Sequence, residues 1–308
     1  MRTRRLGSKG PDVTVIGFGA WEAGGDMWGT NESEEAVVAA MRAGFDAGMN
    51  WIDTAEVYGK GVSEGIVGRA VAGRRDQVLV ASKLAPASEG SGFRPEQVRA
   101  GCEGSLGRLG IDVIDLYQLH WPDATGVPIE DTWGAMSELQ DAGTVRAIGV
   151  SNFDQALIER CEAIRHVDSL QQEFSMLALD DRDLIRWCGD HGTGVVTYGP
   201  LGFGLLTGTI SRDRARSATD WRRADEDGPF TDEKLDHDLP IVDGLRPIAE
   251  RLDISMAQLA LAWNVAQPGV TSAIAGSRNA DHTRDNVAGG DVELDATTLA
   301  EIEALLKR

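Results

Sequence analysis

The sequence predicts an α/β protein of the (β/α)8, or TIM, barrel type, with residues 1–308 forming a single domain. Strand-like and helix-like segments alternate from about residue 17 to the C-terminus without a linker-like break. The length of 308 residues is typical of such barrels. A doubly wound sheet is the alternative, but it normally carries a glycine-rich phosphate loop. Here Gly17-Phe18-Gly19 is followed by Glu22, where GxGxxG requires glycine.

Each barrel strand is predicted from a short run rich in β-branched and other apolar residues. The eight runs are residues 17–20, 50–52, 78–82, 114–119, 146–150, 169–172, 194–198 and 272–274. Before them, residues 4–6 and 13–16 predict a short hairpin around the turn at residues 10–12.

Helices are predicted between the strands from apolar residues at helical spacing. They cover residues 34–47, 63–71, 95–109, 129–142, 154–165, 181–191, 242–252, 255–267, 279–287 and 296–307. Asn31 or Ser33 is expected to cap the first of them. Residues 207–240 are charged and follow the seventh strand, so they predict a long loop on the catalytic face of the barrel. A partly disordered insertion is the alternative interpretation of this stretch.

Composition limits the classes of function. Hydrophobic residues make up 42% and charged residues 26%, which is typical of globular proteins. The formal charge of −19 argues against nucleic acid or an anionic membrane as a partner. Three cysteines without CxxC spacing predict neither a disulfide framework nor a metal site. The sequence shows no signal-peptide or membrane-spanning pattern, which predicts a cytoplasmic protein. We expect it to be a monomer or a weak oligomer.

Four polar residues stand at or just beyond the ends of predicted strands: Asp53, Tyr58, Lys83 and His120. The carboxyl ends of parallel strands share one rim of a barrel, so these side chains should converge. A carboxylate, a phenol, an ammonium and an imidazole together predict a site that transfers protons.

Several motifs resemble those of the aldo-keto reductase family. Residues 53–68 read DTAEVYGKGVSEGIVG, and the family pattern is DTAxxYGxGxSExxxG. Lys83 after VLVAS, His120 after DLYQL, and the IGVSNF of residues 148–153 match three further family positions, in the family order. The resemblance spans residues 17–287. It is nearer to the microbial and potassium-channel β-subunit branch, because residues 48–50 read Gly-Met-Asn instead of Gly-Phe/Tyr-Arg.

The resemblance implies reduction of aldehydes or ketones to alcohols by direct hydride transfer from NADPH, without a metal. Tyr58 would donate the proton to the carbonyl oxygen, and His120 would orient the carbonyl group. A buried ammonium at Lys83, kept charged by Asp53, is expected to lower the pKa of the phenol from its usual value of about 10.

The resemblance also implies a binding site for the nicotinamide end of the cofactor. Ser151 and Asn152, with Gln172, would hold the carboxamide group, and Tyr198 would stack on the nicotinamide ring. Leu201, Gly204 and Leu206 would line the path of the pyrophosphate.

At the adenosine end, Gly276-Ser277-Arg278 matches the family's phosphate-binding turn, and Arg278 would favour NADPH by pairing with the 2′-phosphate. This turn lacks the Lys-Ser of the better-known branch. His282 stands where that branch often has a second Arg. Asp285 replaces the usual Glu beside adenine, and Asn286 is unchanged.

The small carbonyl substrate is poorly specified. Trp21, Trp28 and Trp121 fall on predicted rim loops, and Trp221 lies in the predicted long loop. Trp21 and Trp121 are the preferred candidates for the substrate pocket. A redox-sensing regulatory subunit, like the channel β-subunits, is a second interpretation because such subunits keep the same four catalytic residues. A barrel hydrolase or aldolase is a third, and the cofactor motifs argue against it.

Overall fold

The structure, a computed structural model, describes residues 1–25, 27–28 and 33–307. Within this part, eight parallel strands close into a barrel in the order β10-β3-β4-β5-β6-β7-β8-β9. They are β3 (Ile16–Gly19), β4 (Trp51–Asp53), β5 (Leu79–Leu84), β6 (Ile114–Leu119), β7 (Val145–Ser151), β8 (Ser169–Glu173), β9 (Gly194–Tyr198) and β10 (Val270–Ile274). The predicted (β/α)8 barrel is therefore confirmed.

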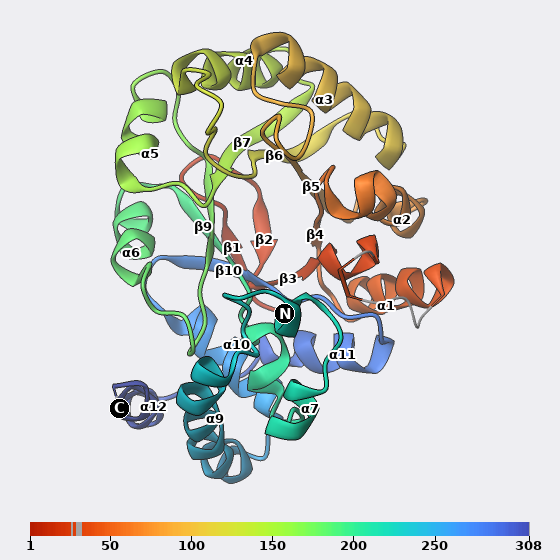
Figure 1. Cartoon of the computed structure of the whole chain (residues 1–308). Coiled ribbons are helices and arrows are strands. Elements are labelled where there is room, and N and C mark those ends of the chain that lie inside the picture. Colours follow the sequence, from red (N-terminus) through yellow and green to blue (C-terminus); the bar gives the residue numbers. More distant parts are fainter. Residues whose placement is uncertain (26, 29–32, 308) are drawn as a thin grey trace.

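Helices surround the strands (Figure 1). They are α1 (Glu34–Asp46), α2 (Val62–Val71), α3 (Pro95–Leu109), α4 (Ile129–Asp141), α5 (Gln155–Glu162), α6 (Arg182–Asp190), α9 (Asp232–Leu252), α10 (Met256–Ala266), α11 (Ala280–Gly289) and α12 (Ala296–Leu306). Ser33 caps α1 by accepting a hydrogen bond from the Ala36 N–H, while Asn31 lies outside the described residues.

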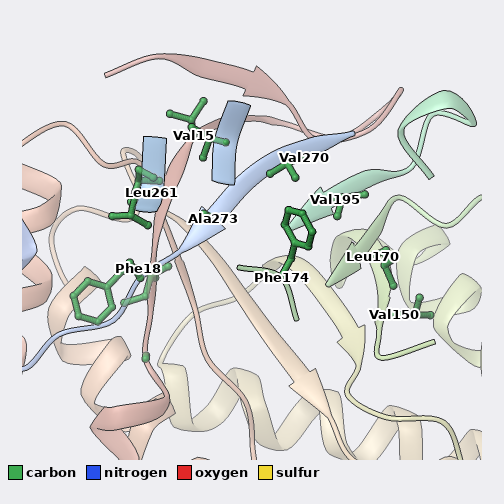
Figure 2. Close-up of a cluster of buried hydrophobic side chains, with 14 of the residues drawn as sticks. Val15, Phe18, Val150, Leu170, Phe174, Val195, Leu261, Val270 and Ala273 are labelled. Atoms are coloured by element: carbon green, nitrogen blue, oxygen red, sulfur yellow. The ribbon is translucent and has the colours of Figure 1, made fainter. Parts of the chain in front are cut away.

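Two layers of apolar side chains hold this arrangement. The larger cluster lies mainly between the strands and the helices, and Figure 2 shows part of it, including Val15, Phe18 and Leu261. The smaller cluster fills the barrel interior. There the Trp51 indole occupies space that a side chain at Gly17 would take, since a Cβ at residue 17 would lie 2.2 Å from it.

A short antiparallel hairpin, β1 (Thr3–Arg5) and β2 (Asp12–Thr14), precedes the barrel, near the position predicted for it. Leu6 and Val13 from this segment join the interior cluster with Trp51 and Leu116. The hairpin therefore closes one end of the barrel, and the functional side chains gather at the other end.

The predicted long loop at residues 207–240 contains more regular structure than the sequence suggested. It carries the short helices α7 (Arg212–Arg216) and α8 (Trp221–Ala224), and α9 already begins at Asp232. Thr231 caps α9 by accepting from the Lys234 N–H, and the helix continues through Pro240. The prolines and the many charges in this stretch concealed the first turns of α9 in the sequence.

No helix in the described part of the chain is long and apolar enough to cross a membrane.

Candidate active site

The four predicted proton-transfer residues converge at the carboxyl ends of three neighbouring strands. Asp53 ends β4, Lys83 is the penultimate residue of β5, and His120 follows β6. Tyr58 begins the short 3₁₀ helix η2 (Tyr58–Gly61), whose close packing requires a glycine at residue 59. There φ is +58°, and a Cβ would lie 2.3 Å from the Gly24 carbonyl oxygen. The DTAEVYG run thus places the phenol over the barrel end.

Lys83 is the centre of this group. Its buried ammonium donates to Asp53 Oδ1, to the Thr54 carbonyl oxygen at 2.9 Å and to the Tyr58 hydroxyl at 3.3 Å. Burial is the largest single effect on the Lys83 pKa and lowers it, but the charges and hydrogen bonds of Asp53 and Tyr58 together outweigh it, and the net shift is upward. Lys83 is therefore a permanent cation beneath the phenol at neutral pH.

Asp53 is held by more than Lys83. Its second oxygen, Oδ2, accepts from Gln171 Nε2 at 3.0 Å and from Gln118 Nε2 at 3.3 Å. These amides come from inward positions on β6 and β8, and the sequence analysis did not select either residue. The available signal was a polar side chain at an inward strand position, where an apolar one would otherwise fill the barrel.

Burial raises the pKa of the Tyr58 phenol above its usual value of 10. The Lys83 ammonium acts in the opposite direction, as expected from the sequence, but it offsets only part of that rise. The expected net lowering is thus wrong for this structure, because desolvation is the larger effect. The phenol is protonated at neutral pH and can donate.

His120 completes the group. Its Nε2 lies 3.4 Å from the Tyr58 hydroxyl oxygen, and its ring stacks on that of Trp121. Burial, with a smaller effect of the Lys83 charge, lowers the pKa of His120 well below its usual 6.5. The imidazole is therefore neutral at physiological pH, and its buried Nδ1 has no hydrogen-bond partner among the described residues.

A cavity of about 1070 Å³ extends from these residues across the end of the barrel. Sixteen of the predicted site residues line it: Trp21, Asp53, Tyr58, His120, Trp121, Ser151, Asn152, Tyr198, Leu201, Gly204, Gly276, Ser277, Arg278, His282, Asp285 and Asn286. Lys83 lies just behind the wall.

Two predicted cofactor residues do not line this cavity. Gln172 faces away from it and donates to Asp181 at 2.8 Å, whereas Gln171 lines the wall. Adjacent residues of a strand point to opposite sides, so the register of β8 decides which of the two consecutive glutamines faces the cavity. Leu206 is also displaced: it is fully buried in the core, behind Leu201 and Gly204 on the wall.

Asn152 connects three strand ends on the nicotinamide side. It adopts the left-handed conformation, with φ of +62°. Its Nδ2 donates to the His120 carbonyl oxygen at 3.0 Å, and its Oδ1 accepts from the Tyr198 hydroxyl at 2.9 Å. The Tyr198 ring is thus fixed at the cavity wall.

The turn after β10 forms the other end of the cavity. Gly276 lies against β3, where a Cβ would come within 2.3 Å of the Gly19 carbonyl oxygen. Asn279 caps α11 by accepting from the N–H groups of residues 281 and 282. Arg278, Arg214 and Arg222 all line the wall. A glycine turn, a helix start and three arginines suit an anionic, phosphate-bearing ligand.

Aromatic rings line the cavity beside Tyr58. Trp21 contacts Trp28, Phe203 and Trp221, with ring centroids 5.1, 6.5 and 5.0 Å away. These four residues, termed the aromatic cluster, come from the loop after β3, the 3₁₀ helix η3 (Gly202–Thr207) and α8. The sequence analysis named Trp21, Trp28 and Trp221 and preferred Trp21, but it did not name Phe203. Trp121, with 42% of its surface exposed, lies at the opposite side, next to His120.

Together these features suit a dinucleotide cofactor lying across the barrel end, with Asn152 and Tyr198 on one side and the glycine turn with Arg278 on the other. Arg222 packs over the Trp28 ring of the aromatic cluster. Among the described residues, no group of three or more His, Cys, Asp or Glu side chains could hold a metal ion.

The model of the aldo/keto reductase family matches residues 15–307. The chain belongs to this family. It is therefore an oxidoreductase of the carbonyl-reducing type that uses a nicotinamide cofactor.

Two relatives match over most or all of their own length and of this chain. The chain is 36% identical to aldo-keto reductase YhdN of Bacillus subtilis, over 90% of this chain and 85% of that protein. It is 31% identical to the NADH-specific methylglyoxal reductase of Escherichia coli, over the whole of both chains.

Solved structures of similar reductases also superpose well. The glycerol dehydrogenase of Gluconobacter oxydans has a TM-score of 0.88 at 30% identity, covering 99% of this chain and 95% of that one. An aldo-keto reductase of Klebsiella pneumoniae in complex with NADPH has a TM-score of 0.78 at 30% identity, covering 99% and 96%.

Proposed function

We propose that this chain reduces aldehydes or ketones to alcohols by direct hydride transfer, with NADPH as cofactor and Tyr58 as proton donor. The observation that carries the proposal is the position of the Tyr58 hydroxyl on the wall of the cavity. It lies 3.3 Å from Lys83 Nζ and 3.4 Å from His120 Nε2.

The chain's own groups account for the proton. Tyr58 gives its proton to the carbonyl oxygen as that oxygen gains negative charge. Lys83 stabilises the phenolate that remains, and Asp53 keeps the ammonium in place. Neutral His120, with hydrogen on Nε2, donates a hydrogen bond to the same carbonyl oxygen and orients it. A bound reduced nicotinamide would supply the hydride to the carbonyl carbon.

The cofactor residues proposed are those of the cavity wall. Ser151, Asn152 and Gln171, which replaces Gln172, would hold the nicotinamide carboxamide, and Tyr198 would stack on its ring. Leu201 and Gly204 would border the pyrophosphate on one side, and the turn at Gly276 and Ser277 would also border it.

Arg278 would pair with the 2′-phosphate of the adenosine. His282, Asp285 and Asn286 would border the adenine, although Asp285 already accepts from Ser255 Oγ at 2.7 Å and from Gln258 Nε2 at 2.6 Å. The substrate would lie between Trp21 and Trp121, beside Tyr58.

The test is consumption of NADPH by the purified protein, with NADH in parallel, on aromatic and aliphatic aldehydes, ketones and methylglyoxal, and oxidation of glycerol in reverse. The relatives' names motivate the last two compounds. Turnover with a member of the panel is expected. Tight NADPH binding without turnover on any compound would favour a redox-sensing role instead.

Tyr58→Phe is the matched variant for the chemistry. It keeps the ring and removes the hydroxyl, so kcat should fall about 10²- to 10⁴-fold while the Kd for NADPH stays within about twofold. Persistence of activity in this variant would show that the proton donor is another group.

Arg278→Ala tests the adenosine end. Loss of a charge-assisted contact to phosphate should raise the Kd for NADPH about tenfold or more and change the Kd for NADH much less. An equal loss for both cofactors, measured by calorimetry, would contradict the 2′-phosphate assignment.

A further inference from the structure

Arg278 already has a carboxylate partner within the cavity. Its Nε lies 3.4 Å from Glu22 Oε2, and the two side chains keep 22% and 28% of their surface exposed. Both residues line the cavity wall. A ligand phosphate approaching Arg278 therefore meets a guanidinium that is shared with a carboxylate.

The fold keeps these two side chains near each other. Glu22 lies in the 3₁₀ helix η1 (Trp21–Gly24), directly after β3, and Arg278 lies in the turn after β10, the neighbouring strand. Close backbone contacts fix both segments. Gly276 lies against Gly19, and a Cβ at Gly24 would lie 2.6 Å from the Gly59 amide nitrogen. The ion pair is thus set by the closure of the barrel between its first and last strands.

We propose that Glu22 sets the choice between the two nicotinamide cofactors by competing with the adenosine 2′-phosphate for Arg278. The inference rests on the proposed function, since it assumes that the cavity holds the dinucleotide with its adenosine end at Arg278. Glu22 reduces the preference for NADPH that Arg278 alone would give, and so permits use of NADH.

The physical reason is the difference in charge between the two cofactors at this atom. A phosphate monoester carries close to two negative charges at neutral pH, so a carboxylate beside it repels it and weakens its pairing with arginine. The 2′-hydroxyl of NADH is uncharged and can donate a hydrogen bond to a carboxylate. Glu22 therefore penalises one cofactor and tolerates the other.

A second carboxylate adds to the same field. Asp220, just before α8, accepts from Arg222 Nη2 at 2.7 Å. The pKa of Asp220 is lowered mainly by its hydrogen bonds from Arg222, with a smaller contribution from the charge of Arg278. Arg222 and Arg278 thus each have a carboxylate close by that offsets part of their positive charge.

The experiment is Glu22→Gln, which keeps the shape of the side chain and removes its charge. Calorimetry would measure the Kd of NADP⁺ and NAD⁺ on the full-length protein, independently of turnover. The Kd for NADP⁺ should fall about fivefold, as expected for a partly exposed ion pair, and the Kd for NAD⁺ should change less than about twofold. Equal changes for both, or none for NADP⁺, would overturn the inference and leave the reductase function standing.

Two further measurements locate the effect. Adenosine 2′,5′-bisphosphate should gain affinity in Glu22→Gln, and AMP should not. In the background of Arg278→Ala, Glu22→Gln should have no effect on NADP⁺, because the residue it acts through is gone. A gain that persists without Arg278 would overturn the proposed competition.

Asp281→Asn is the matched control for a general change in charge. Asp281 lies three residues from Arg278 but pairs with Arg284. A gain for NADP⁺ as large as that of Glu22→Gln would overturn a specific role for Glu22. Failure of the unaltered protein to bind either dinucleotide would overturn this inference together with the proposed function.

Discussion

Asp53 and Lys83 are 1% and 0% exposed, and barrel strands and buried amides fix their positions, whereas the aromatic cluster on the same cavity is held by contacts between rings. Trp21 and Trp28 lie in the loop after β3, and Trp221 lies more than 190 residues later in the chain. Among the described residues, no strand pairing joins these segments. The barrel therefore fixes the four candidate proton-transfer groups, whereas loops form the cavity wall beside them.

This comparison predicts that a substitution in the buried Asp53–Lys83 pair lowers both the stability of the protein and its activity. Lys83→Met leaves the Asp53 carboxylate buried without its counter-charge, which costs about 3–5 kcal/mol in the free energy of unfolding. The reduction rate should fall about 10²- to 10⁴-fold. Urea unfolding and steady-state kinetics would measure the two losses.

The double variant Asp53→Asn/Lys83→Met separates the loss of stability from the loss of activity. Removing both charges should restore most of the stability, because no unpaired charge remains, but none of the activity. If the single variant is as stable as the parent protein, the pair is less isolated from water than its burial indicates.

The pH dependence of reduction tests which group gives the proton. Since the pKa of Tyr58 is raised above 10, the phenol is protonated at all lower pH values. The rate should be level through neutrality and should fall about tenfold per pH unit only above the Tyr58 pKa. His120, with a pKa well below 6.5, should contribute no inflection between pH 7 and 9. An inflection near pH 7 that disappears in His120→Asn would assign the proton to the imidazole.

A substitution in the aromatic cluster should have the smallest effect and should act on binding. Trp221→Leu removes ring contacts to Trp21, Trp28 and Phe203, which should raise the Kd for the cofactor or for an aromatic substrate about three- to tenfold. The midpoint of thermal unfolding should change little, since Trp221 is only partly buried.

Trp187→Leu is its matched control. Trp187 stacks on His191 at a centroid distance of 4.3 Å and does not line the cavity. The Kd values of the Trp187→Leu variant for the cofactor and for an aromatic substrate should equal those of the parent protein. A loss of binding equal to that of Trp221→Leu would mean that the cluster acts through overall packing.

The same contrast explains what could be predicted from the sequence. The barrel followed from the alternation of strands and helices, because burial imposes a pattern that the chain displays locally. The meeting of Asp53, Tyr58, Lys83 and His120 followed from the rule that parallel strands share one rim. Both depend on regular structure, which sequence periodicity encodes.

Other parts of the site depend on register or on contacts between distant loops. The choice of Gln172 over Gln171 failed by a single residue, because adjacent strand positions face opposite sides. The direction of the net Tyr58 pKa shift required knowledge of burial as well as charge. Glu22 was noted only as the residue that breaks a glycine pattern, because its contact with Arg278 joins positions 256 residues apart.

The barrel closes through pairing of β10 with β3, which joins Ala273 to Ile16 and Ile274 to Gly17. Arg4, in the hairpin that closes the opposite end, donates to the carbonyl oxygens of Val265 and Val270. During synthesis the first barrel strand, β3, therefore has an unpaired edge until the last strand, β10, has left the ribosome. A nascent chain stalled before residue 270 should remain open to proteases, and resistance should follow release of the completed chain.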